Sequence, residues 1–205
     1  MAITKKRKKF FDVEIPIIRK QTQLYAFEIK ELENRNIKYD LTRILKGKNV
    51  LLRLKVIVKE ENATAIPIEL EIMSSFLRRV VRKGTDYIED SFSAESKDSI
   101  LRIKPLLITR AKVSKQIRRV LREKAKEELI KYVKSKNSEE IFEEILKNNF
   151  QRELSSKLKK IYPLSFCDIR ILKVEKFLNE TSKQKTKINS PSKKEKISEE
   201  ESKKE

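Results

Sequence analysis

The chain has 205 residues and a formal net charge of +19, and self-repulsion of that size destabilises a compact monomer unless a polyanionic partner supplies counter-charge. It contains no histidine, one cysteine and two glycines, which excludes the commonest general base, an intrachain disulfide, a cysteine zinc site and a glycine-rich phosphate loop. We therefore expect a binding protein with no cofactor, metal or small-molecule substrate, and not an enzyme.

The chain begins with a basic arm. Residues 1–9 include five consecutive cations at positions 5–9 and have no apolar h-region behind them, which argues against a signal peptide. An arm of this composition cannot bury itself, so we expect it to be disordered alone and either solvated or laid along a phosphate backbone.

The next part of the chain is strand-like. Segments 24–32, 37–41, 50–58 and 63–72 are rich in β-branched and aromatic residues and predict strands. In segment 50–58 the apolar residues alternate with Arg53 and Lys55, which is typical of a half-buried antiparallel strand. Residues 59–62 predict the hairpin loop that leads into the following strand.

A first basic amphipathic helix is predicted at 74–83. Ser74 is placed to cap it, apolar residues recur at 76, 77, 80 and 81, and Gly84 is placed to stop it. The opposite side of this helix is cationic and consists of Arg78, Arg79, Arg82 and Lys83.

A second basic helix is the most informative segment. After a predicted strand pair at 87–92 and 99–109, residues 108–126 place Val113, Ile117, Val120 and Leu121 at helical spacing on one side. Eight Lys or Arg and one carboxylate, Glu123, lie between positions 105 and 126. Solubility is served by mixed signs, so a nearly all-positive side with four arginines indicates a surface for phosphate groups.

The last ordered part is predicted as helix, helix and strand. Residues 137–140 read as a capping box before a helix at 141–146, a second helical piece covers 154–161 and ends before Pro163, and 165–175 predict a strand. The free Cys167 lies in that strand, where we expect a small buried hydrophobe and a reducing compartment. Residues 178–205 are low-complexity and predict a disordered charged tail.

These segments predict an α+β fold with a mostly antiparallel β-sheet or barrel-like core and amphipathic basic helices. We expect one domain at 10–177, between a disordered arm at 1–9 and a tail at 178–205. The apolar runs are too short to cross a bilayer, so we expect a soluble cytoplasmic protein. The candidate nucleic-acid-binding residues are Lys5, Lys6, Arg7, Lys8, Lys9, Arg78, Arg79, Arg82, Lys83, Arg110, Lys112, Lys115, Arg118, Arg119, Arg122 and Lys126.

The order of four segments resembles a known family. These are FDVEIP at 11–16 after a basic leader, FLRRVVRK at 76–83, ITRAKVSKQIRR at 108–119, and IYPL at 161–164 followed by DIRILK at 168–173. Over residues 10–176 the chain is similar to the small-subunit ribosomal protein eS1 (S3Ae-type) family of archaea and eukaryotes. Its length and its Lys, Ile and Asn bias resemble archaeal members.

The resemblance implies a structural protein of the ribosome. Such a protein would sit on the platform of the small subunit near the messenger exit and contact ribosomal RNA, neighbouring ribosomal proteins and messenger RNA near the exit. It implies RNA contacts by the leader at 5–9 and by the basic helix at Arg110, Lys112, Lys115, Arg118, Arg119 and Arg122.

Two other classes of function stay open from the sequence. A free-standing, nonspecific nucleic-acid binder of the chromatin type would use the same cations. A protein-docking scaffold would use the strands and the Glu-rich helical region 139–160.

Overall fold

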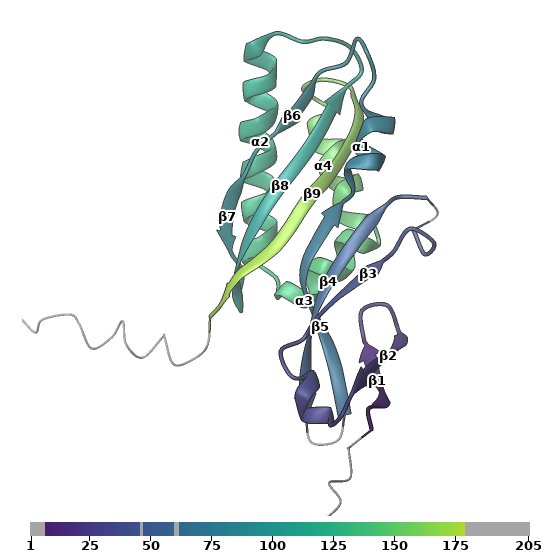
Figure 1. The fold of residues 1–205 in the computed structure, drawn as a ribbon. Coiled ribbons are helices and arrows are strands. Elements are labelled where there is room, and N and C mark those ends of the chain that lie inside the picture. The colour runs from purple at the N-terminus through teal and green to yellow at the C-terminus, as the bar shows by residue number, and fades with distance from the viewer. Residues whose placement is uncertain (1–6, 46, 60–61, 179–205) are drawn as a thin grey trace, which may run out of the picture.

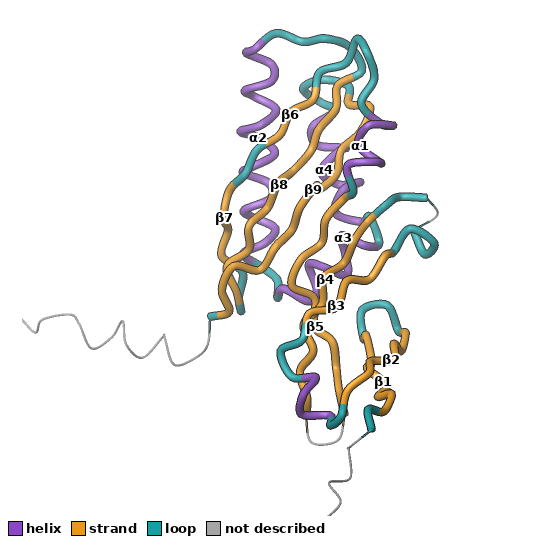
Figure 2. Tube along the Cα trace, in the orientation of Figure 1, coloured by secondary structure: helices purple, strands orange, loops and turns teal. Residues whose placement is uncertain are grey.

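The computed structural model describes residues 7–45, 47–59 and 62–178. In this part of the chain, four α-helices and a nine-stranded sheet form an α+β fold, as predicted (Figure 1, Figure 2). The strands are β1 (Lys9–Ile15), β2 (Lys20–Ala26), β3 (Asn36–Asp40), β4 (Val50–Lys59), β5 (Asn62–Ile72), β6 (Tyr87–Glu89), β7 (Phe92–Glu95), β8 (Ser99–Thr109) and β9 (Leu164–Phe177). The helices are α1 (Ser74–Val80), α2 (Lys115–Lys134), α3 (Ser138–Leu146) and α4 (Asn149–Leu158), and a short 3-10 helix spans Ile29–Leu32.

Strand β5 is where the sheet branches. Its first residues pair in parallel with β1 at Val13–Ala63, whereas its last residues pair antiparallel with β9 at Leu70–Leu172. One arm of the sheet therefore holds β2, β1, β5, β4 and β3, and the other holds β9, β8, β6 and β7. All strand pairs other than β1–β5 are antiparallel in the described residues, and the pairings give a branched open sheet.

Helices α2, α3 and α4 cover one face of the sheet (Figure 1). Leu121, Ala125, Leu129 and Val133 are buried on α2 at a spacing of four residues, which is the stripe that an amphipathic helix presents to a core. They join α4 and the inward side chains of β8 in one hydrophobic cluster. This burial fixes α2 on the sheet and leaves its opposite side to solvent.

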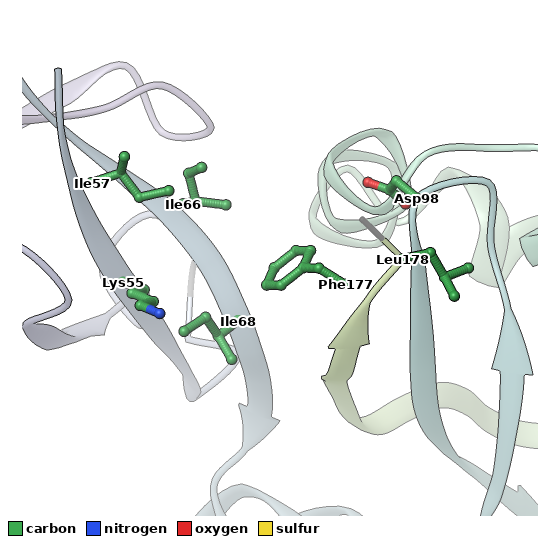
Figure 3. Close-up of a pocket in the computed structure, with 7 residues that line it drawn as sticks. All are labelled: Lys55, Ile57, Ile66, Ile68, Asp98, Phe177 and Leu178. Carbon is green, nitrogen blue, oxygen red and sulfur yellow. The ribbon is translucent and has the colours of Figure 1, made fainter. Parts of the chain in front are cut away.

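An apolar groove lies at the fork between β5 and the end of β9. Ile57, Ile66 and Ile68 line one wall, and Phe177 points toward them from the other wall, where Leu178 follows it (Figure 3). The groove has a volume of about 520 Å³. Its lining contains one cation and one carboxylate, so it is not part of a basic surface.

The predicted strand 24–32 is wrong in its second half. Strand β2 ends at Ala26, and the chain then turns into the 3-10 helix. The turn is closed because the Phe27 backbone N–H donates to the Glu31 carboxylate at 3.0 Å. Leu32 is fully buried by this turn, so its hydrophobicity reflects a core position and not a strand.

The first basic helix is shorter than predicted. Helix α1 ends at Val80, Met73 occupies the N-cap position, and Ser74 makes no capping hydrogen bond. No residue of α1 is fully buried, and Val81 is exposed. Gly84 has a φ of +86°, but it lies in the turn beyond the helix and not at its end.

The second basic helix begins later than predicted and runs further. Ile108 and Thr109 belong to β8, where they pair with Phe166 and Leu164 of β9, and α2 starts at Lys115. Val120 is exposed, so the apolar side of the helix runs through Leu121 instead. Two smaller boundaries also move: Ile161 lies beyond the end of α4, and Lys9 belongs to β1 and not to the arm.

Asp98 organises the start of α3 from the turn between β7 and β8. Its carboxylate accepts hydrogen bonds from the Ser138 backbone N–H at 2.9 Å, the Ser138 hydroxyl at 2.5 Å and the Ser96 hydroxyl at 2.8 Å. The predicted capping box is also present, since the Asn137 N–H donates to Glu140. Burial acts to raise the pKa of Asp98, but the hydrogen bonds from Ser138 and Ser96 outweigh it and hold the pKa below its usual value.

Removing this carboxylate should destabilise the fold in a pH-dependent way. We expect Asp98→Ala to lower the free energy of unfolding by about 1 to 2 kcal/mol at neutral pH, as for the loss of a helix cap. Asp98→Asn is the variant that tests the role of the charge. A carboxylate whose pKa is lowered by folding stabilises the folded state at pH values above its pKa in the unfolded chain, which is about 4. The difference in stability between the wild type and Asp98→Asn should therefore disappear as the pH falls below about 4 and through the lower pKa of the folded state. Urea unfolding at several pH values measures this, and a difference that persists unchanged at acid pH would contradict it.

Candidate nucleic-acid interface

Two basic segments that are far apart in the sequence lie at the same end of the molecule. Helix α1 and the connector after it carry one segment, and the loop between β8 and α2 with the start of α2 carries the other (Figure 1). We call this the basic end, and its cations are Arg78, Arg79, Arg82, Lys83, Arg110, Lys112, Lys115, Arg118, Arg119 and Arg122.

Asp86 joins the two segments. Its backbone carbonyl accepts from the Thr109 N–H at 3.0 Å, and its carboxylate accepts from the Val113 N–H at 3.0 Å. The Asp86 N–H donates in turn to the Thr109 hydroxyl at 3.1 Å. A third connector is tied in as well, because the Arg110 N–H donates to the Pro163 carbonyl at 3.3 Å. These bonds fix the loop that carries Arg110 and Lys112.

The start of α2 is itself suited to anions. The Ser114 hydroxyl caps the helix by accepting from the Ile117 N–H at 3.4 Å, and the first turn contains no acidic residue. The N-terminus of a helix carries a partial positive charge, which adds to the charges of the side chains around it. Lys115 is exposed on this first turn, directly beside the loop cations.

Most cations of the basic end lack an acidic partner. Among the described residues, no ion pair involves Arg78, Arg79, Arg82, Lys83, Arg110, Lys112, Lys115 or Arg122. Arg79 is engaged differently, since it donates to the Asn49 side-chain carbonyl at 2.8 Å and lies over the Phe76 ring. The basic end therefore presents charge that its own fold does not neutralise.

Two arginines do meet carboxylates. The Nε atom of Arg119 is 2.8 Å from Glu123, and the Nε atom of Arg118 is 4.0 Å from Asp86. The Arg119 side chain keeps 79% of its surface exposed, and its hydrogen bond to Glu123 raises its pKa. Exposed pairs of this kind are weak, so a phosphate can compete with Glu123 for Arg119.

A groove under α1 adds an aromatic residue that the sequence did not single out. The groove has a volume of about 390 Å³ and is lined by Leu77, Arg78, Val81, Tyr87, Glu89, Leu106 and Arg170. Arg170 pairs there with Glu89, so Arg78 is the unpaired arginine of the lining among the described residues. Tyr87 keeps 59% of its surface exposed although it begins a strand. A predicted strand says nothing about which ring stays uncovered, so no signal in the sequence could have identified it. An exposed ring in a groove that Arg78 also lines suits a stacked base.

The structure does not bring all sixteen predicted residues together. Arg7, Lys8 and Lys9 lie at the β1–β2 hairpin, at the opposite end of the molecule from the start of α2 (Figure 1). At a rise of 1.5 Å per residue, Lys126 lies about 16 Å along α2 from Lys115. Its ammonium lies over the Phe92 ring. Lys5 and Lys6 lie outside the described residues, as does the tail from 179 onward.

Three further features of the described residues concern metal ligands, membrane spans and the free cysteine. They contain no group of three or more His, Cys, Asp or Glu side chains that could hold a metal ion. No helix in the described part of the chain is long and apolar enough to cross a membrane. Burial and the neighbouring Asp168 raise the pKa of the free Cys167 to about 12, so its thiol stays protonated.

Comparison with known proteins identifies a family. The model of the ribosomal S3Ae family matches residues 4–177, which is most of the chain. No curated protein matches it. The matched range includes both segments of the basic end and the β1–β2 hairpin.

Proposed function

Because the chain belongs to the ribosomal S3Ae family and is therefore a small-subunit ribosomal protein, we propose that it binds ribosomal RNA through the basic end. In this proposal it is a structural component that carries no catalysis, and it works in the cytoplasmic ribosome. The observation that supports it most directly is the junction at Asp86, which fixes two cationic segments side by side. The Asp86 carboxylate pairs with Arg118, but eight of the ten cations of the basic end have no ion pair among the described residues.

The proposed mode of binding is neutralisation of phosphate with recognition of RNA shape. Arginine forks at positions 78, 82, 110 and 122 can each hold phosphate oxygens in pairs, and the N-terminus of α2 supplies backbone N–H groups to the same anions. Contacts to phosphate position a protein on RNA but carry no direct sequence information. Tyr87 in the groove under α1 would add stacking on an unpaired base.

The finer placement follows the family resemblance. We propose that the protein helps to form the platform and the messenger-exit region, where it contacts neighbouring ribosomal proteins and messenger RNA near the exit. Lys126, farther along α2, and the arm at 5–9 belong to the proposed RNA-binding set, with the arm reaching RNA from the opposite end of the molecule.

Sedimentation separates this function from a free-standing nucleic-acid binder. In a sucrose gradient of cell extract at high magnesium, we expect the protein in the small-subunit fractions and not at the top of the gradient. Binding of the purified protein to its ribosomal RNA should also weaken steeply with salt, with a log–log slope of about 0.7 to 0.9 for each phosphate neutralised. A protein found wholly in the top fraction would support the chromatin-type alternative and overturn the ribosomal assignment of the proposal.

A further inference from the structure

Three exposed aromatic rings gather at one end of the β1–β2 hairpin. Phe10 and Tyr25 are direct partners across the two strands, with ring centroids 5.0 Å apart. They keep 68% and 51% of their surface exposed, and Phe27 beside them keeps 40%. Five exposed aromatic residues occur in the described part of the chain, so three of the five are in this one place.

The opposite face of the same hairpin is covered by the protein itself. Val13, Ile15 and Ala26 are buried there, and Phe11 and Leu24 pack against the core. Strand side chains alternate between faces, so Phe10 and Tyr25 must point away from that core. These two rings therefore do not contribute to the hydrophobic core, and they lie on the outer face of an edge hairpin.

Cations adjoin the rings. The Lys8 ammonium lies 5.6 Å from the centroid of Tyr25 and 5.1 Å from that of Phe27. Arg7 and Lys9 are exposed on either side of Lys8 in the sequence, but Lys9 pairs with Ala26 and so its side chain leaves the strand on the opposite face from the rings. Arg35 donates to the Tyr25 carbonyl at 3.3 Å. A cation over an exposed ring is held weakly, so a stacked base can displace Lys8 from the ring and leave its ammonium free for a phosphate.

Carboxylates near the rings restrict the side from which a polyanion can approach them. Asp12 and Glu14 lie on the same face as Phe10 but nearer the tip of the hairpin, where Glu14 accepts from Gln21. Glu31 lies beyond Phe27 and is held by the Phe27 N–H. A polyanion would therefore reach the rings from the side of Arg7 and Lys8 and would stop short of the tip.

We propose that Phe10 and Tyr25, flanked by Phe27 and Lys8, form a stacking platform for unpaired nucleobases of ribosomal RNA. The proposal rests on the RNA-binding function above and adds a second, separate contact at the opposite end of the molecule. Rings and not aliphatic side chains form the platform, and the Lys8 ammonium borders it, which favours a base over an apolar protein segment. Base–aromatic stacking of this kind is tolerant of sequence.

Paired substitutions test the platform in the free protein. Binding to an unstructured single-stranded RNA of about a dozen nucleotides is measured by fluorescence anisotropy at moderate salt, for the wild type and for Phe10→Leu with Tyr25→Leu. The leucines keep apolar bulk at two positions whose side chains contact each other and Lys8 and lie on the face away from the core. We expect a loss of about fivefold to a hundredfold in affinity for each ring removed, and Tyr25→Phe should bind as the wild type does.

An abasic strand of the same length is the matched control. It keeps the phosphates and lacks the bases, so the wild type and the leucine variant should bind it equally. If the leucine variant binds the ordinary strand as tightly as the wild type does, the platform is overturned. The proposed function is tested separately, and it stands if substitutions at the basic end weaken binding to ribosomal RNA. If the basic end has no such effect, the proposed function fails instead.

Crosslinking in the assembled small subunit tests the occupant. A photoreactive phenylalanine analogue is placed at Tyr25, and the subunit is irradiated. A crosslink to ribosomal RNA supports the platform. A crosslink to a neighbouring protein would overturn it, because a protein segment would then be the occupant of the rings.

Discussion

Charge reversal at Arg110, Lys115 and Arg122 should prevent the protein from entering small subunits. These three side chains are exposed at the basic end and have no acidic partner among the described residues, so the substitution to Glu breaks no ion pair of the fold. We expect affinity for ribosomal RNA to fall by about a hundredfold or more, since three charge-assisted phosphate contacts become repulsive. The slope of log affinity against log salt should fall by about 2 to 3.

The control for this triple variant is a second triple variant with the same change in charge. Lys38, Lys97 and Lys131 are exposed, lie away from the basic end and have no ion pair in the part of the chain that the structure describes. Their reversal to Glu should leave incorporation into subunits largely intact. Equal losses in both variants would mean that net charge and not the position of the cations controls binding.

Reversal of Arg118, Arg119 and Arg122 without loss of incorporation would favour the protein-docking alternative.

Removal of Asp168 should cause the largest loss of stability that the structure predicts. The Lys48 ammonium lies 2.5 Å from the Asp168 carboxylate, and the two side chains are 16% and 5% exposed. Asp168 also accepts from the Gln151 side chain at 3.2 Å and the Ile169 N–H at 2.8 Å. Asp168→Ala leaves the Lys48 charge buried without its partner, so we expect the free energy of unfolding to fall by about 3 to 5 kcal/mol in urea.

Replacement of both Lys48 and Asp168 distinguishes the cost of leaving Lys48 charged and unpaired from other causes of lost stability. Lys48→Met with Asp168→Leu removes both charges, and the double variant should recover most of the stability that Asp168→Ala loses. Glu175→Ala is the exposed counterpart, since Glu175 pairs with Arg102 at the surface and its loss should shift the unfolding midpoint far less. A double variant as unstable as Asp168→Ala would show that the ion pair is not the source of the loss.

The regular elements of the fold were predictable where one periodicity dominates. Strand β4 follows the alternation of residues 50–58, and the capping box at 137–140 marks the start of α3. The helix predicted from residue 108 failed because Ile108 fits the helical and the strand pattern equally well. The predicted strand at 99–109 and the predicted helix from 108 overlapped there, and the pairing of Ile108 with Phe166, more than fifty residues later, shows that the strand prediction was correct.

The sequence predicted that the candidate interface is cationic, but it did not predict which cations lie together in space. The excess of cations in the central basic segment indicated a surface for polyanions, but no local pattern shows that Asp86 joins this segment to the connector after α1. A local pattern does separate Arg119 from Arg122, because Glu123 follows Arg119 by four residues on the helix and pairs with it, whereas Lys126 follows Arg122 by four. The exposed rings of Tyr25 and Tyr87 were missed because a strand pattern assigns faces only after the partners are known. RNA binding by the sixteen residues and the archaeal source stay predictions.

Chemical protection of single residues in the assembled subunit shows whether RNA phosphates cover the basic end. Lysine acylation and arginine modification by a dicarbonyl reagent would be compared by mass spectrometry in the free protein, the small subunit and the nuclease-treated subunit. We predict that Arg110, Lys112, Lys115 and Arg122 react in the free protein, are protected in the subunit and react again after nuclease treatment. Equal reactivity of these four residues in the free protein and the subunit would contradict the claim that RNA phosphates cover the basic end.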